Sequence, residues 1–231
     1  MKRIDFLKTS LLAGAAGLSL PLLGKTERTD STYDRLMDQV GFNHLPNKDI
    51  KSQNTVLHRA STRWHADHGW LDTHHTFSFA NYRNPQRMNF GVLRVLNDDI
   101  IGGGKGFGMH PHDNMEIISI PIEGALEHKD SMGNTTVINE GEVQVMSAGT
   151  GIYHSEFNKL EDKKAKFLQI WLFPNKRDVK PRYDQIRLTN IQKENKFNQI
   201  LSPFEDDQGV WIHQNAWFHL GRFDKNVEQN Y

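Results

Sequence analysis

The sequence has no cysteine, no excess of charge of either sign and no apolar run long enough to cross a bilayer comfortably. Without cysteine there can be no disulfide, thiolate zinc site or lipidated cysteine, so a bound metal would need nitrogen and oxygen ligands. The 28 Lys and Arg residues balance 28 Asp and Glu residues, so no net field recruits nucleic acid or an anionic membrane surface. We therefore expect no nucleic-acid partner and no stable membrane span.

The first 24 residues differ in composition from the rest of the chain. Basic residues precede residues 11–24, which carry no charged side chain. A basic start followed by a short uncharged core is typical of an export signal. Residues 3–8 resemble a twin-arginine signal in which Ile4 replaces the second arginine. We expect residues 1–24 to direct export to the periplasm, the alternative being an uncleaved N-terminal helix on a cytoplasmic protein, and residues 25–54 to form a linker.

From residue 55 onward, β-branched and aromatic runs alternate with turn residues, a pattern that predicts strands. The predicted strands are 56–59, 76–80, 89–96, 143–148, 166–173, 209–213 and 216–221. Residues 97–99 and 130–134 are predicted to be turns. The histidines within residues 64–75 lack a paired spacing, and we interpret them as hydrogen-bonding structure rather than metal ligands. The 231 residues can form one sizeable domain, and the pattern predicts an all-β one.

Two pairs of polar residues indicate a metal site: His110 with His112, and His154 with Glu156. Residues two apart in a strand point to the same face, so neighbouring strands would bring three imidazoles and a carboxylate together. Such a set binds a divalent first-row metal and leaves positions open for a ligand. The alternative is that these are unrelated polar residues at the ends of strands.

A second carboxylate competes for the fourth ligand position. Glu116 lies four residues after His112 and would share its face if the strand were regular. The alternation of Glu116 with Ile118, Ile120 and Ile122 predicts the interior of a small barrel behind a polar mouth. The spacing by itself does not choose between Glu116 and Glu156.

The residues around both pairs resemble the two sequence motifs of the cupins. The first motif is matched by Gly104, His110, His112 and Glu116, and the second by Gly141, Gly149, His154 and Asn158. Ser147 stands where cupins usually have proline. Within the cupins, residues 123–128, 130–134 and 148–156 are most similar to the pirin branch, and the resemblance covers roughly residues 55–220.

The resemblance to pirins implies a cupin-type jelly-roll β-barrel at residues 55–180, and the start of a truncated second barrel at residues 181–231. It implies that one divalent metal is bound by His110, His112, His154 and Glu156. Iron(II) is the expected metal, with Mn, Ni, Cu, Co and Zn as alternatives. Glu116 and His128 would then lie outside the ligand shell, where such residues orient a ligand histidine.

The resemblance also implies an activity of the quercetin 2,3-dioxygenase type, in which O₂ opens the ring of a flavonol-like substrate. Glu156 would act as the base that accepts the proton of the substrate hydroxyl. The alternatives are a non-catalytic metal-binding pirin that serves as a redox-sensitive regulatory module, and another cupin reaction such as isomerisation. Because the second barrel would be incomplete, we expect either a homodimer or docking of residues 200–231 onto the first barrel.

Overall fold

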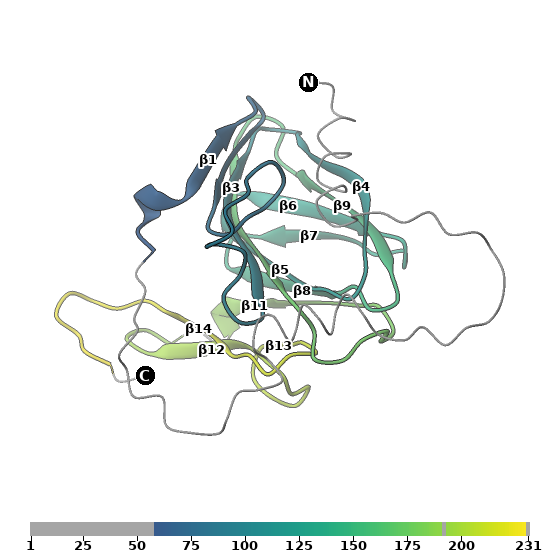
Figure 1. The fold of residues 1–231 in the computed structure, drawn as a ribbon. Helices are drawn as coiled ribbons and strands as arrows, with labels where there is room; N and C mark the ends of the chain where they lie inside the picture. Colours follow the sequence, from purple (N-terminus) through teal and green to yellow (C-terminus); the bar gives the residue numbers. More distant parts are fainter. Residues whose placement is uncertain (1–57, 191–192, 230–231) are drawn as a thin grey trace.

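The computed structural model describes residues 58–190 and 193–229. Figure 1 shows two β-sheets that face each other, with a smaller sheet of C-terminal strands beside them. Strands and short 3₁₀ turns make up all the regular structure in these two ranges, so the all-β prediction is confirmed. None of the described segments is a helix long and apolar enough to cross a membrane. The predicted export signal and the linker at 25–54 lie outside the described residues and stay predictions.

The larger sheet has seven strands and the facing sheet has four. The seven, in spatial order, are β1 (Trp64–Asp67), β2 (Leu71–His75), β3 (Leu93–Ile101), β10 (Ala165–Leu172), β5 (Glu116–Glu123), β8 (Glu142–Ser147) and β11 (Arg182–Arg187). The four are β4 (Gly106–His112), β9 (Ile152–Asn158), β6 (Ala125–Asp130) and β7 (Thr135–Asn139). The third sheet contains β13 (Val210–Trp211), β12 (Phe197–Ser202) and β14 (Phe218–Gly221), and the 3₁₀ turns are η2 (Ala60–Thr62) and η3 (Leu188–Asn190).

The space between the two larger sheets is filled by apolar side chains that alternate along their strands. Ile101 and Phe167 from the seven-stranded sheet pack with Leu126 and Ile138 from the four-stranded sheet, and all four are fully buried. Burying a side chain of this size stabilises the fold by about 1.5–3 kcal/mol. This cluster fixes the distance between the sheets and hence the width of the interior that contains the histidines.

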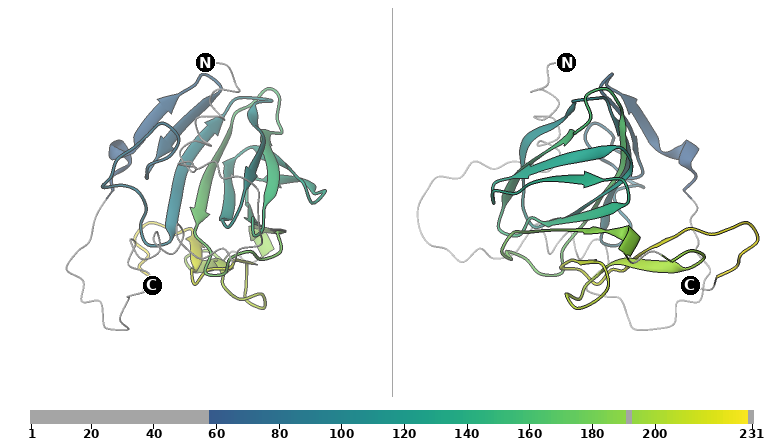
Figure 2. Two further views of the ribbon diagram at one scale, coloured as in Figure 1. Left: turned by 45° about the vertical axis from the view of Figure 1, so that its right-hand side comes forward. Right: turned by 180° about the vertical axis from the view of Figure 1, so that it is seen from behind.

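The C-terminal segment covers the outer face of the seven-stranded sheet, as the views in Figure 2 also show. Leu201 and Ile212 are buried in one cluster with Ile118 and Ile170 of the large sheet. The expected docking onto the first barrel is thus confirmed for the part of residues 200–231 that runs from Ile200 to Phe218.

The large sheet continues past the domain boundary predicted at residue 180. β11 begins at Arg182 and pairs with β8 along its length. The barrel therefore takes in residues that the sequence assigned to the C-terminal extension.

Two predicted strands and one predicted turn were wrong. In the strand predicted at 56–59, residues 58 and 59 are not part of a strand, and residues 56 and 57 lie outside the described ranges. The second strand is Leu71–His75, and residues 76–80 form a bend and an isolated bridge rather than a regular strand. Residues 97–99, predicted to be a turn, lie inside β3 between β2 and β10. Asp99 is buried there beside Thr73, whose hydroxyl donates a hydrogen bond to its carboxyl group. A tertiary partner thus lets a turn-type residue occupy a central strand.

Candidate metal centre

Strands β4 and β9 bring the two predicted ligand pairs together. They are antiparallel neighbours in which His110 lies directly opposite His154 and His112 opposite Ile152. Directly opposed residues on one face have Cβ atoms ~4.5–5.5 Å apart. The strands can approach this closely because Gly106 has no side chain: a Cβ atom there would lie 2.2 Å from the carbonyl oxygen of Glu156.

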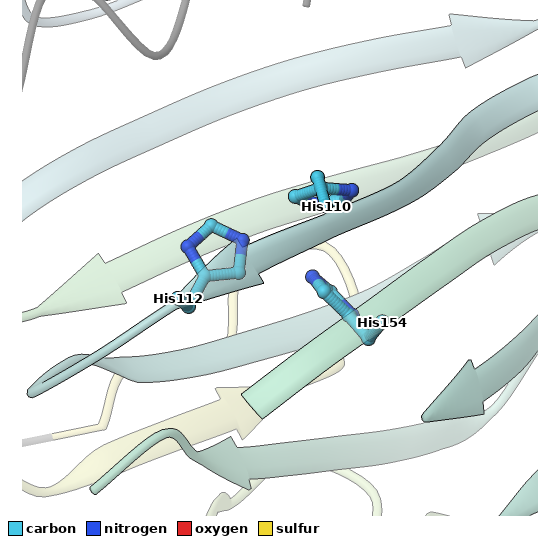
Figure 3. Close-up of side chains that lie close together, drawn as sticks. All are labelled: His110, His112 and His154. Atoms are coloured by element: carbon cyan, nitrogen blue, oxygen red, sulfur yellow. The ribbon is translucent and has the colours of Figure 1, made fainter. Parts of the chain in front are cut away.

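The three imidazole rings point toward one another from these two strands (Figure 3). The ring centroids of His110 and His154 are 4.4 Å apart, those of His112 and His154 are 4.9 Å apart, and those of His110 and His112 are 4.8 Å apart. One ring nitrogen from each histidine lies within 4.8 Å of the other two. The sequence therefore predicted correctly that the histidines of both pairs converge.

The ring nitrogens are in the state that metal binding requires. Burial lowers the pKa of His112 to about 3, with a further contribution from His110, and it lowers the pKa of His154 well below its usual value. Both rings are therefore neutral at pH 7, and neutral imidazole is the ligand form. A hydrogen bond of 2.7 Å between His110 Nδ1 and the carbonyl oxygen of Gly108 makes Nδ1 the protonated nitrogen and leaves the lone pair on Nε2.

Buried polar atoms without partners indicate what the site accommodates. Nε2 of His112 and both ring nitrogens of His154 are buried and have no hydrogen-bond partner among the described residues. Leaving such atoms unpaired is costly, so a bound group that pairs with them would be stabilising here. A divalent cation satisfies lone pairs on all three rings, and the residues present fit a metal of the kind the sequence indicates.

Glu156 lies close to the histidines but is not part of their cluster. It follows His154 by two residues on the same face of β9, and only 1% of it is exposed. Its Oε1 lies 2.9 Å from the hydroxyl of Ser119, and its Oε2 accepts a hydrogen bond of 2.8 Å from Nε2 of Gln169. Each carboxylate oxygen keeps a further lone pair, so these contacts are compatible with a ligand role. Glu156 as fourth ligand and base stays a prediction.

The residues around Glu156 form a polar network across the interior. The Ser119 hydroxyl is 2.7 Å from Oε1 of Gln169 as well as 2.9 Å from Glu156, and its single proton can serve only one of them at a time. Burial raises the pKa of Asp99 to about 7, and the nearby charge of Glu156 contributes to the shift. Two buried acids thus lie inside the barrel, and nearby hydroxyl and amide groups stabilise them.

The expected position of Glu116 was wrong. Its carboxylate accepts a hydrogen bond of 2.7 Å from the hydroxyl of Ser147, beside Arg182, on the face of the large sheet that the C-terminal segment covers. Ile118 and Ile120 share this outer face, and Ile122 is 46% exposed. Counting alternate residues from His112 does not give the face of Glu116, because the chain passes from the four-stranded to the seven-stranded sheet between β4 and β5.

His128 lies next to the site as the sequence indicated. Its ring centroid is 5.4 Å from that of His154, and its Nε2 is 3.0 Å from Oδ2 of Asp130, with neither side chain exposed. Burial raises the pKa of Asp130, but hydrogen bonds from Asn134 and His128 outweigh this and lower the pKa overall. A role for His128 in orienting His154 stays a prediction.

The sequence reasoning missed three residues that line the site. They are Ser119, Gln169 and Trp171, the last of which packs its ring against His112 with centroids 4.8 Å apart. All three lie in the seven-stranded sheet, opposite the strands that carry the histidines. In the sequence, the strand-like alternation of residues 117–121 and 167–171 was the only sign that these residues face the interior. It did not indicate which residues of the other sheet they would contact.

Comparison with known proteins agrees with this site and fold. The sequence model of the family described as pirin matches residues 53–172. A protein of Escherichia coli K12 named quercetin 2,3-dioxygenase is 49% identical over 158 residues, which cover 68% of this chain and 67% of that protein. A pirin-like protein of Caulobacter vibrioides is 45% identical over 142 residues, covering 62% of this chain and 61% of the relative.

The fold comparison points the same way. The crystal structure of the bacterial pirin YhhW from Escherichia coli in complex with nickel(II) matches with a TM-score of 0.64 and 47% identity, over 68% of this chain and 66% of that one. The expected cupin-type jelly roll is thereby confirmed. The matching region spans roughly two thirds of the length of these relatives. Since sequence, fold and the histidine cluster agree, this chain belongs to the pirin family of the cupins.

Proposed function

We propose that this pirin is a metal-dependent dioxygenase that uses O₂ to open the ring of a flavonol-like substrate. The observation that carries the proposal is the convergence of three histidines, two of which have unpaired buried nitrogens, in an interior that also contains the Glu156 carboxylate. The name of the Escherichia coli relative supports the substrate class. Iron(II) is the proposed metal, and nickel(II), with which the related Escherichia coli pirin was crystallised, is an alternative.

The protein's own groups have distinct tasks in this proposal. His110, His112 and His154 would bind the metal through the nitrogens described above, and Glu156 would accept the proton of the substrate hydroxyl. A bound divalent ion supplies a Lewis acid for that hydroxyl and redox chemistry for O₂. Ser119 and Gln169 hold the Glu156 carboxylate in a water-poor interior, where a base is fixed in one orientation.

Oxygen consumption tests the activity directly. Purified protein loaded with iron(II) should consume O₂ when quercetin is added, and the metal-free protein should not. Metal binding without substrate-dependent O₂ consumption, across several flavonols and metals, would contradict the enzyme and favour the regulatory alternative.

The two glutamates should respond differently to the same substitution. Glu156→Gln removes the proposed base and a charged ligand, so we expect activity to fall by ~10²–10⁴-fold, as for loss of a general base, together with weaker metal binding. Glu116→Gln should leave both nearly unchanged, because its carboxylate lies on the other face of the sheet. Metal content and turnover of the two purified variants are the measurements. Loss of metal in Glu116→Gln but not in Glu156→Gln would reverse the assignment.

The support for Glu156 can be tested through Gln169. Gln169→Leu removes the 2.8 Å hydrogen bond to Oε2, and outer groups of this kind typically contribute ~10–100-fold to affinity or activity. We expect kcat to fall within that range while the metal content stays normal, since the base loses the hydrogen bond that holds it in one orientation. Gln199→Leu, which changes an amide on β12 outside the barrel, is the matched control. A reduced thermal midpoint with an unchanged kcat would show that Gln169 is merely structural.

A further inference from the structure

A second cluster of potential metal ligands lies outside the barrel, on the hairpin of β1 and β2. It consists of His65, Asp72 and His74, and one ligand atom from each lies within 4.8 Å of the other two. The side chains are 51%, 41% and 37% exposed, so water reaches all three. This group belongs to a different strand pair from the central histidines and has no part in the chemistry proposed above.

The hairpin register creates the cluster. His65 and His74 are directly opposite each other, and the next pair on the same face is Asp67 with Asp72. The imidazole rings stack with centroids 4.4 Å apart and an interplanar angle of 18°. Because β2 also pairs with β3 along its whole length, the strand that carries Asp72 and His74 is fixed on both sides.

The distances already match those between neighbouring ligands of one metal ion. Oδ1 of Asp72 is hydrogen-bonded to Nε2 of His65 at 2.9 Å, as the interpretation of these histidines as hydrogen-bonding structure expects, and lies 3.7 Å from Nδ1 of His74. A bound cation would replace the proton of this hydrogen bond. With metal–ligand bonds of ~2.0–2.2 Å, adjacent ligand atoms are about 3.0 Å apart in an octahedron and about 3.4 Å apart in a tetrahedron. A cation shared by these three atoms therefore needs only small side-chain rotations.

We propose that His65, Asp72 and His74 form a second, solvent-accessible site for a divalent first-row cation. Two imidazoles and one carboxylate select Zn²⁺, Cu²⁺ or Ni²⁺ over Mg²⁺ and Ca²⁺, which prefer sets of oxygen ligands. Water completes the coordination shell because the three groups lie on an exposed face. The site is weaker than the central one, since it has one ligand fewer than the predicted central set and exposed side chains that lose more freedom on binding.

The neighbouring charges allow a cation at this position. Asp98 of β3 is opposite His74 and adds a negative charge next to the cluster. It also contacts Arg63 and Lys166, both at 3.5 Å, so part of its charge is compensated. Asp67 accepts a hydrogen bond of 2.7 Å from the Gly69 amide and remains available as an outer negative group.

Zn²⁺ titration of the full chain separates the two sites. In the variant His110→Ala/His112→Ala, calorimetry should detect one remaining weak equivalent of Zn²⁺. Adding His65→Ala, Asp72→Ala or His74→Ala should weaken that binding by at least ~10-fold. Loss of a group that only orients a metal ligand typically costs ~10–100-fold in affinity, and loss of a ligand itself should cost no less. Cu²⁺ bound to the same background should show nitrogen coupling in its electron paramagnetic resonance spectrum.

Two controls make the result specific. Asp67→Asn removes a nearby charge and should change the affinity only slightly, and His58→Ala removes an exposed histidine outside the hairpin and should have no effect. Thermal unfolding of each variant shows whether it is folded. The proposal is wrong if the background variant takes up no Zn²⁺, or if its Zn²⁺ binding survives loss of both His65 and His74.

Discussion

Replacing both His110 and His112 with alanine is expected to yield folded protein that retains almost no tightly bound metal. Each substitution removes one of the three ring nitrogens that lie within 4.8 Å of one another. The affinity should fall by more than the ~10–100-fold typical of outer groups, because ligands themselves are lost. Elemental analysis after gel filtration in a weak chelator measures this, since the chelator removes ions from the exposed hairpin site.

The same variant should keep its fold. Both substituted histidines lie at the end of β4 and are not part of the apolar cluster around Ile101 and Phe167. We expect the metal-free variant to have nearly the thermal midpoint of metal-free wild type, while only the wild type gains stability when metal is added. Tightly bound metal at the wild-type level in the double variant would exclude these histidines as ligands. His58→Ala serves as the histidine control.

Truncating Leu201 to alanine is expected to lower the free energy of unfolding by about 2–5 kcal/mol. Leu201 is part of β12 and is fully buried against the outer face of the large sheet. For a chain of this size, each kcal/mol lowers the thermal midpoint by about 2–4 °C. A loss of this size would show that the C-terminal segment is part of the same cooperative unit as the barrel.

Leu220→Ala provides the matched comparison on β14. Leu220 is 37% exposed, so its truncation should cost about 1 kcal/mol or less. Metal content should be normal in both variants, because the cluster around Leu201 and the central histidines lie on opposite faces of the large sheet. Equal and small losses for the two leucines would mean that the segment does not pack on the barrel as described. A concentration-dependent midpoint would instead support the expected homodimer, which stays a prediction.

The sequence by itself determined that the two residues of each pair share a face of their strand, because that relation depends only on local geometry. Strand alternation places residues two apart on one face, so His110 and His112 had to point the same way. The hairpin at 130–134 was equally local, and it joins β6 and β7 as predicted. The signature shared with pirins then supplied the pairing of the two strands, which the spacing alone left open.

Only the tertiary structure decided the positions that depend on a turn or on a facing sheet. Asn114 has a φ of 44°, and the bend there takes the chain from one sheet to the other, so the face of Glu116 could not be counted from His112. Asp99 is in a strand because Thr73 on the next strand is its partner, and Gln169 reaches Glu156 from the opposite sheet. His65 and His74 meet because the register of a hairpin aligns them. Contacts between residues far apart in sequence are set by packing and register, and local patterns contain no information about them.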